Sequence, residues 1–420
     1  MEPRIIKKMR YTLPRDLRKL LEPIRLLSEK AHLPVFLVGG CVRDIVLGRP
    51  PLDVDIVVEG DTAVLARQAA RFCKAELVSH PQFLTHTLLL AGGRHVDIAR
   101  ARREFYPEPA VLPTVEPASL QDDLMRRDFS INAMAMSLNQ DDFCHLWDPF
   151  NGLTDLRNKK IRILHSESFR DDPTRIFRAA RFAGRFDYML DWRTRECLVN
   201  AVIQQTPDRL SGARLREELL QILMEEDPRH AFRLLDEWGT LLFLVPHLKW
   251  SKSHELLFAR LLRARLKGDS VALRLMGLLH SLPVPNATGC MGHLMFPQRT
   301  IESVGQALMI LHKLRENHLT VEDVKKLDEK KLSTEGRFFV EQAIRMPSLF
   351  FRKKAAEAWK HLQESNPCLS GEELRKLGYK PGPLFSRILD ALRRARWEGK
   401  LRTREEEIRF VCSVFPQGSV

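Results

Sequence analysis

The stretch from Val35 to Val58, VFLVGGCVRDIVLGRPPLDVDIVV, constrains the fold of this chain more than any other segment. It opens with four apolar residues of largely β-favouring type, breaks at Gly39-Gly40, and continues through residues that suit a short helix. After two prolines, aspartates alternate with branched apolar residues, which is typical of a strand with one polar face. The stretch therefore predicts a strand, a glycine turn, a short helix and a second strand in immediate succession.

Two aspartates, Asp53 and Asp55, lie two residues apart in the second predicted strand. Side chains alternate faces along a strand, so both carboxylates project from one side and repel each other unless a cation lies between them. Oxygen ligands at this spacing suit Mg²⁺. The preceding Gly39 and Gly40 let backbone N–H groups approach an anion closely. Either feature alone is usually a plain turn or a solvated strand face, but together they predict a nucleoside triphosphate site.

The charge of the chain favours a polyanionic partner. Its 420 residues include 67 Lys and Arg against 54 Asp and Glu, a net charge of +13. Nucleic acid is the first expectation and an anionic membrane surface the second. No apolar run approaches the ~20 residues of a membrane span, and the first 18 residues lack the apolar core of a signal peptide, so we expect a cytoplasmic protein. The seven cysteines are scattered without metal-ligand spacing, and we expect no zinc site.

A third carboxylate follows in a predicted β-hairpin. Residues 85–90 and 95–99 read as two strands joined by a glycine-containing turn, and Asp97 lies on the second of them. Beside the strand that carries Asp53 and Asp55, Asp97 could supply a third carboxylate to the metal ions. It could equally be a solvated residue or a hydrogen-bonding partner of the ligands.

The segment from Arg100 to Asp123 contains four prolines and loses all periodicity. Proline prevents a continuous helix and makes a core strand improbable, so the segment is predicted to be a long loop. Long loops beside an active site often guide substrates, although a passive connection is the alternative.

Two further segments carry residues suited to a nucleotide. Arg126-Arg127-Asp128 begins an octapeptide that ends at Ala133; its arginines can bind phosphate oxygens, and Asn132 can position a hydroxyl or a ring. Farther on, Asp171 and Asp172 precede Pro173 at a predicted helix start, and Asp172 and Arg175 are one turn apart and can pair or act jointly. Read alone, the first segment is more often a surface ion cluster and the second an intrahelical salt bridge.

The rest of the chain is predicted to be helical, with amphipathic segments between residues 212 and 329 and a helix-turn-helix tail after residue 369. Basic residues at 260–267 and 352–354 offer cationic surface for RNA, although each run by itself is more often a solvated helix face. His280 is followed by serine and is interpreted as a core or surface histidine.

Taken together, these motifs closely resemble those of the class II tRNA nucleotidyltransferases and bacterial poly(A) polymerases of the polymerase-β-like superfamily. The stretch at 39–55 matches the signature GGxVRD…DxD, and the octapeptide at 126–133 matches RRDFTINA except that Ser130 replaces Thr. The segment at 171–175 resembles the motif EDxxR, with Asp171 in place of Glu. The position of the loop at 100–123 matches the flexible loop that governs addition of the terminal A.

The resemblance implies roles for individual residues. Asp53 and Asp55 would bind the catalytic metals. The position of Asp97 is acidic in the family, which makes Asp97 the third candidate catalytic residue. Base choice would come from Asp172 and Arg175, which would hydrogen-bond the edge of the incoming base, while Arg178 would serve the triphosphate or the helix packing. The implied nucleotide-binding residues also include Gly39, Gly40, Arg43, Arg127, Asp128 and Asn132, and the implied RNA-binding residues of the tail are Arg393, Arg394 and Arg396.

The resemblance also implies an α+β fold. A polymerase-β-like nucleotidyltransferase head with a mixed or antiparallel sheet (1–160) would precede an all-α neck (161–245), body (246–360) and tail (361–420). The expected activity is template-independent, Mg²⁺-dependent nucleotidyl transfer from ATP to the 3′ end of tRNA. CC-only members usually have a truncated flexible loop, and residues 104–123 do not look truncated. Because the proline-rich character of this segment is closer to that of dedicated A-adding members, we expect A addition onto tRNA ending in CC, with complete CCA addition from CTP and ATP next. CC addition, poly(A) synthesis and non-catalytic RNA binding are the further alternatives.

Overall fold

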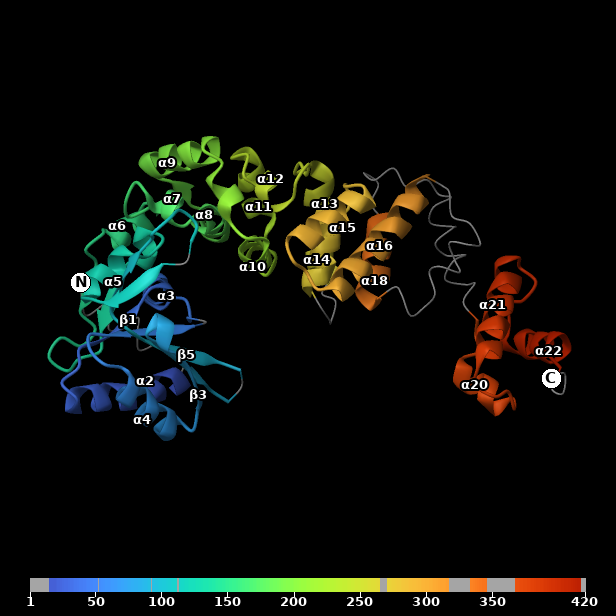
Figure 1. The fold of residues 1–420 in the computed structure, drawn as a ribbon, viewed down its shortest axis with the longest axis horizontal. Helices are drawn as coiled ribbons and strands as arrows, with labels where there is room; N and C mark the ends of the chain where they lie inside the picture. Colours follow the sequence, from blue (N-terminus) through green and yellow to red (C-terminus); the bar gives the residue numbers. More distant parts are fainter. Residues whose placement is uncertain are drawn as a thin grey trace. The chain divides into compact units, whose positions relative to one another are not determined.

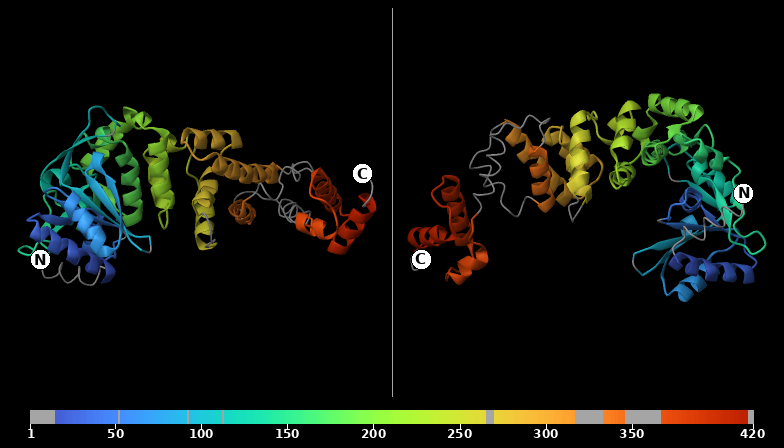
Figure 2. Two further views of the ribbon diagram at one scale, coloured as in Figure 1. Left: turned by 60° about the horizontal axis from the view of Figure 1, so that its bottom comes forward. Right: turned by 180° about the vertical axis from the view of Figure 1, so that it is seen from behind.

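The structure is a computed structural model that describes residues 15–51, 53–91, 93–111, 113–264, 270–316, 333–345 and 367–416. The chain forms two compact units, drawn in Figures 1 and 2: one comprises Met1–Glu218 and His230–Phe243, and the other Leu219–Arg229 and Leu244–Val420. The predicted division into four parts, with boundaries at 160, 245 and 360, stays a prediction. None of the helices in the described part of the chain is both long and apolar enough to cross a membrane.

A seven-stranded mixed sheet organises the first unit, in the order β3-β4-β5-β2-β1-β8-β9. All neighbours are antiparallel except β2 and β5, which are parallel. The predicted hairpin at 85–99 is confirmed as β4 and β5. The strands are β1 (Val35–Val38), β2 (Val54–Val58), β3 (Glu76–His80), β4 (Thr85–Leu89), β5 (His95–Arg100), β8 (Ala135–Ser137) and β9 (Leu146–Trp147).

The two faces of the sheet have different neighbours because side chains alternate along each strand. Ile56 of β2 and Val96 of β5 belong to the larger hydrophobic core, which also includes buried residues of α2 (Arg15–Lys30), α3 (Gly40–Leu47) and α4 (Ala63–Cys73). In Figure 1, α2 and α4 lie side by side against the sheet. Val57 packs in a smaller core on the opposite face. Asp55 alternates with Ile56 along β2, and Asp97 alternates with Val96 along β5. Both aspartates therefore lie on the second face, away from α2 and α4.

The segment predicted to be a long loop differs in the structure. Residues 102–105 (β6, Arg102–Phe105) and 114–117 (β7, Thr114–Pro117) pair as an antiparallel two-stranded ribbon. Three of the four prolines lie in the connection between these strands, where no ladder hydrogen bond is lost, so the prolines do not prevent pairing. A short helix, α5 (Leu120–Met125), follows the ribbon and begins with a capping box at Ser119.

Helices dominate the rest of the first unit, as the sequence predicts. Two short strands, β10 (Lys160–Ile161) and β11 (Met189–Leu190), pair in parallel beside them. Short 3₁₀ turns lie at Pro81–Phe83, Ser130–Asn132 and Thr206–Arg209. The helices up to the junction between the units are α6 (Gly152–Arg157), α7 (Ser168–Asp171), α8 (Thr174–Phe186), α9 (Trp192–Ile203), α10 (Gly212–Leu223), α11 (Arg229–Glu237) and α12 (Leu241–Leu244).

The described part of the second unit is helical. One group comprises α13 (Lys252–Ala264), α14 (Ser270–Leu279), α15 (Val284–His293), α16 (Gln298–Glu316) and α18 (Thr334–Ile344). Its His280 is fully buried, with its ring against His254, in agreement with a core histidine. The predicted helix at 320–329 and the basic residues 265, 267 and 352–354 lie outside the described residues.

The tail has a hydrophobic core of its own, formed by α20 (Gly371–Lys376), α21 (Pro383–Trp397) and α22 (Arg404–Val414). Capping boxes at Ser370 and Thr403 begin α20 and α22. The predicted helix-turn-helix is therefore present, with a third helix added.

Candidate active site

The Gly39-Gly40 turn joins β1 to α3. Gly39 has a φ of 70°, and a β-carbon there would lie 2.5 Å from Nη1 of Arg127 and 3.6 Å from Oδ2 of Asp55. Both the backbone conformation and this close approach require glycine. The N–H of Gly39 donates to the carbonyl of Met134 (3.2 Å), so the N–H of Gly40, at the first turn of α3, is the better candidate phosphate donor of the two.

The three predicted carboxylates gather at neighbouring positions. Asp55 of β2 is directly opposite Asp97 of β5 in the parallel register, and Asp53 immediately precedes β2 with a side chain that is 65% exposed. Oδ1 of Asp97 accepts a hydrogen bond from Oγ1 of Thr87 (2.6 Å). Nε2 of His95 lies 3.7 Å from Oδ1 of Asp53.

The electrostatic environment of Asp55 favours the binding of a cation next to its carboxylate. Burial raises the pKa of Asp55, and the carboxylates of Asp97 and Asp53 raise it further, against the lowering effect of Arg127. A divalent cation would relieve this repulsion. The described residues contain no group of three or more His, Cys, Asp or Glu side chains placed to hold a metal ion. A Mg²⁺ site made of one or two carboxylates and substrate phosphates needs no such group, so the residues present fit the ion.

Arg127 is held in place by Asp123, which the sequence analysis did not single out. Nη2 of Arg127 and Nε of Arg126 each donate to the carboxylate of Asp123 at 2.9 Å, and Asp123 is completely buried on α5. Although burial would raise the pKa of Asp123, the two guanidinium groups hold it below its ordinary value. Glu104 of the ribbon accepts a further bond from Nη1 of Arg126 (2.8 Å). The spacing of Asp123 from the two arginines, three and four residues on a helix, was the available signal.

A chain of buried hydrogen bonds runs from α3 to α8. Nη1 of Arg43 donates to Oδ1 of Asn132 (2.6 Å), and Nδ2 of Asn132 donates to Oδ1 of Asp128 (2.9 Å). Arg178 donates to Oδ2 of Asp128 from Nε (2.9 Å) and Nη2 (2.6 Å). Against the effect of burial, Arg178 and Asn132 lower the pKa of Asp128 to about 2. The four predicted residues are therefore brought together as one network in which Asn132 contacts Arg43.

The guanidinium of Arg43 also lies over two aromatic rings. Its Cζ is 4.9 Å from the ring centre of Phe186 and 5.4 Å from that of Phe182, and the two rings are stacked. Such contacts favour a cation held over the ring faces. A β-carbon added to Gly40 would lie 3.5 Å from Nη2 of Arg43. This guanidinium group is therefore next to the glycine turn.

Asp172 and Arg175 lie at the start of α8 but do not pair with each other. Oδ1 of Asp172 accepts from Oγ1 of Thr174 (2.6 Å) and from Nη2 of Arg214 (2.7 Å). Buried Arg175 donates from Nη1 to Oγ of Ser168 (2.6 Å) and from Nη2 to the carbonyl of Arg126 (2.7 Å). Of the two arrangements that the spacing allowed, the ion pair between Asp172 and Arg175 is not formed. Asp172 follows the end of α7, Pro173 is the N-cap of α8, and the carboxylate of Asp172 turns to Thr174 and Arg214 instead.

Arg214 of α10 connects Asp172 to the ribbon. Its Nη1 donates to the carbonyl of Ala110 (2.7 Å), which lies in the connection between β6 and β7. The N–H of Ala110 donates to the carbonyl of Asp171 (3.2 Å). Sequence analysis missed Arg214 because it is 42 residues away from Asp172 and carries no local pattern.

Similar sequences and structures decide the family. Residues 35–162 match the family "Poly A polymerase head domain", and residues 205–251 match "Probable RNA and SrmB- binding site of polymerase A". The A-adding tRNA nucleotidyltransferase of Halalkalibacterium halodurans is 32% identical over 98% of this chain and 96% of its own length. This chain belongs to the class II tRNA nucleotidyltransferases.

Two further comparisons agree with this family. The A-adding tRNA nucleotidyltransferase of Geobacter sulfurreducens is also 32% identical over 98% of this chain, which spans only 48% of that relative's length. A solved structure of a CCA-adding enzyme in an apo form is 32% identical and superposes with a TM-score of 0.74 over 98% of this chain and 99% of that one. The predicted α+β architecture of this nucleotidyltransferase is thereby confirmed. The family as a whole depends on divalent metal ions.

The three tail arginines of this nucleotidyltransferase differ in surroundings. Arg396 donates to the fully buried Glu407 (Nη1 to Oε1, 2.6 Å), and Arg393 is only 8% exposed, with Nη1 3.4 Å from Oδ1 of Asp390. The contact of Arg396 joins α21 to α22, whereas that of Arg393 lies within α21. Arg394 is exposed, and of the three it is the one whose position suits contact with RNA.

Proposed function

We propose that this nucleotidyltransferase adds AMP from ATP to the 3′ end of tRNA that already ends in CC. The observation that carries the choice of A is the similarity over nearly its whole length to relatives named A-adding enzymes, one of which has almost the same length. The paired ribbon at 102–117 argues against the CC-only alternative, for which a truncated segment is expected there.

The reaction is nucleotidyl transfer at the α-phosphate. The tRNA 3′-hydroxyl attacks this phosphorus in line, a P–O bond forms to the tRNA, and the bond to the pyrophosphate leaving group breaks. Asp53 and Asp55 would hold Mg²⁺, which supplies activation of the hydroxyl and neutralises charge on the departing pyrophosphate. Asp97 accepts a hydrogen bond from Thr87 of the neighbouring strand, so we assign it a supporting role beside the two ligands.

The triphosphate would lie over the glycine turn. Gly40 offers a backbone N–H at the start of α3, and Arg127 places its guanidinium beside Gly39 and Asp55. Arg43 lies next to the same turn, and its guanidinium group is held by a hydrogen bond to Asn132. Its positive charge would therefore stabilise the phosphates from a fixed position. Asp128 and Arg178 extend this support to α8.

Base choice is assigned to Asp172 and Arg175. Both side chains are oriented by contacts, Asp172 by Arg214 and Arg175 by Ser168, and hydrogen bonds from oriented groups discriminate between bases strongly. Complete CCA addition is the second candidate, favoured by the structural similarity to a CCA-adding enzyme.

One assay distinguishes these activities. Purified enzyme with Mg²⁺ is given tRNA ending at the discriminator base, at C, or at CC, with CTP alone, ATP alone, or both. Product from the CC substrate with ATP, and none from the shorter substrates with CTP, is expected. Extension of all three substrates to CCA would overturn the proposed A specificity. Asp53→Ala and Asp55→Ala should abolish incorporation and leave tRNA affinity nearly unchanged, and retained activity would contradict their assignment as metal ligands.

A further inference from the structure

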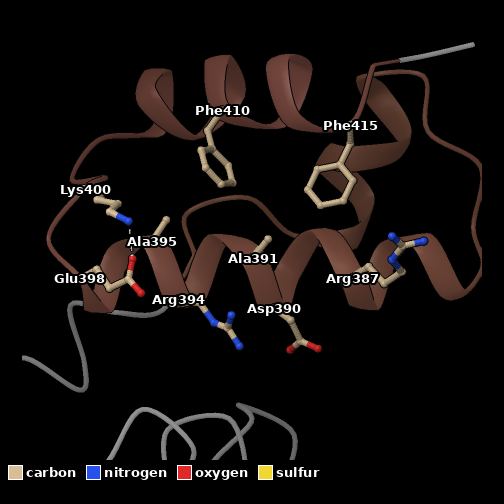
Figure 3. Close-up of a pocket in the computed structure, with 9 residues that line it drawn as sticks. All are labelled: Arg387, Asp390, Ala391, Arg394, Ala395, Glu398, Lys400, Phe410 and Phe415. Carbon is tan, nitrogen blue, oxygen red and sulfur yellow. Dashed lines mark ion pairs between the residues drawn. The ribbon is translucent and has the colours of Figure 1, made fainter. Parts of the chain in front are cut away.

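We propose that a hollow in the tail binds one unstacked nucleobase of the RNA substrate, an inference that rests on the proposed function. The hollow has a volume of about 440 Å³ and lies between α21 and α22. Figure 3 shows Ala391 and Ala395 of α21 pointing toward the rings of Phe410 and Phe415 on the opposite side. Its volume is within the range of sites that bind small planar molecules.

The two alanines are the reason that this space exists. They are one helical turn apart on the same face of α21, and their methyl groups leave empty a region that larger side chains would fill. The rings of Phe410 and Phe415 consequently stay partly exposed although they pack against the tail core. Partly exposed aromatic rings offer stacking surface to any base, because every base has a π face.

The backbone at Phe415 is held in position by two hydrogen bonds. Oη of Tyr379 donates to the carbonyl of Phe415 (2.8 Å), and the N–H of Phe415 donates to the carbonyl of Val411 (2.9 Å). The hollow is therefore formed before any ligand binds, and a base entering it pays little of the ordering cost that weakens binding to flexible surfaces.

Charge around the hollow selects a nucleic acid over an apolar peptide. Exposed Arg387 and Arg394 are two helical turns apart on α21, about 10 Å along the axis, and within the described residues neither forms an ion pair with a carboxylate. Of the two acidic residues that line the hollow, Glu398 pairs with Lys400 (2.7 Å) and Asp390 pairs with Arg393 (3.4 Å). Residues 367–416 contain eleven Lys and Arg and seven Asp and Glu, an excess of four positive charges. Cations beside an apolar slot suit a phosphate backbone with its base inserted.

Filling the hollow tests the inference. In full-length protein, Ala391→Leu places bulk between the two rings, and Ser386→Leu adds the same bulk to an exposed position of α21 outside the hollow. The dissociation constant for tRNA ending in CC is measured by filter binding without ATP, and kcat and KM for A addition are measured separately. Ala391→Leu should raise the dissociation constant and KM about 10-fold with kcat unchanged, and Ser386→Leu should match the wild type.

A second measurement separates base insertion from phosphate contact. Arg394→Gln should reduce the slope of log affinity against log salt concentration by about 1, whereas Ala391→Leu should leave that slope unchanged. Arg375→Gln removes one charge from α20, away from the hollow, and should leave the slope as it is in the wild type. Thermal unfolding of each variant verifies that the tail is folded.

Unchanged tRNA affinity in folded Ala391→Leu, or an equal loss in Ser386→Leu, would overturn the inference. A reduced kcat with unchanged affinity would overturn it too. Because binding is measured without ATP, a protein that binds tRNA through the hollow but incorporates no AMP would overturn the proposed function alone.

Discussion

Nη1 of Arg127 lies 2.5 Å from the point where Gly39 would carry a β-carbon, so the guanidinium occupies space that only glycine leaves open. Gly39→Ala should displace Arg127 from Asp55 and lower kcat/KM at least 10-fold, because small misplacements in an active site are costly. Gly48→Ala is the control for a substitution at positive φ without a close contact: Gly48 has a φ of 74°, but nothing lies within 4 Å of its β-carbon position.

Gly48 is in the left-handed helical conformation (φ 74°, ψ 25°), which costs alanine roughly 1–2 kcal/mol. Gly39 has a ψ of −134°, a conformation that alanine adopts at greater cost, so thermal unfolding should shift more in Gly39→Ala than in Gly48→Ala. Only Gly39→Ala should lose activity. Equal activities in the two variants would contradict the role assigned to the contact with Arg127.

Asp123 is predicted to position the arginine pair. Asp123→Asn removes the charge that Arg126 and Arg127 share, leaves two partly uncompensated buried cations, and should destabilise the protein by about 3 kcal/mol. It should also lower kcat/KM more than 10-fold because Arg127 is released. The neighbouring Asp122→Asn affects only an exposed capping box and should cost less than about 1 kcal/mol, with activity kept. Similar activity losses in both variants, measured by steady-state kinetics, would refute the positioning role.

Arg214 is predicted to control nucleotide choice through Asp172. Arg214→Ala frees the Asp172 carboxylate and the carbonyl of Ala110, so the ratio of kcat/KM for ATP to that for CTP should fall about 10-fold. Arg216→Ala, two residues along α10, is the control and should keep the ratio. A parallel decrease with both nucleotides in Arg214→Ala would mean that this arginine supports the fold without selecting the base.

Glu218 makes the stability of the first unit depend on pH. Burial raises the pKa of Glu218 from 4.5 to about 7, against the lowering effect of Arg178 and Arg181, and its Oε2 is buried without a hydrogen-bond partner. Between pH 4.5 and pH 7 the folded state binds more protons at Glu218 than the unfolded state does. The contribution of Glu218 to the free energy of unfolding is therefore fully present below pH 4.5 and is lost as the pH rises through 7.

Glu218→Gln should therefore raise the free energy of unfolding at pH 8.5 by about 2–3 kcal/mol and leave it nearly unchanged at pH 4. Denaturant unfolding of the wild type and of Glu218→Gln at both pH values measures the difference in the free energy of unfolding. A stabilisation of equal size at the two pH values would show that ionisation of Glu218 is not its cause.

Local patterns in the sequence determined the glycine turn, the aspartate strand and the hairpin with Asp97. Each of these depends on side-chain alternation or on a few adjacent residues, and such signals can be read without tertiary contacts. The net charge and the motif resemblance likewise pointed correctly to the family. The positions of the three carboxylates on one face followed from strand parity alone, once β2 and β5 were adjacent.

Tertiary structure decided which partner each charged side chain takes. Spacing allowed Asp172 to pair with Arg175 or to act jointly with it, but Pro173 interrupts the helix between them and the distant Arg214 binds the carboxylate of Asp172. The ribbon strands β6 and β7 were missed because their pairing residues are separated by a proline-containing connection. The burial of Arg393 and Arg396 depends on α22 packing against α21, and no local pattern encodes which face of a helix another helix will cover. The pairing of segments that are far apart in the sequence depends on the free energy of the whole packed unit. This pairing can therefore be seen only in the folded structure.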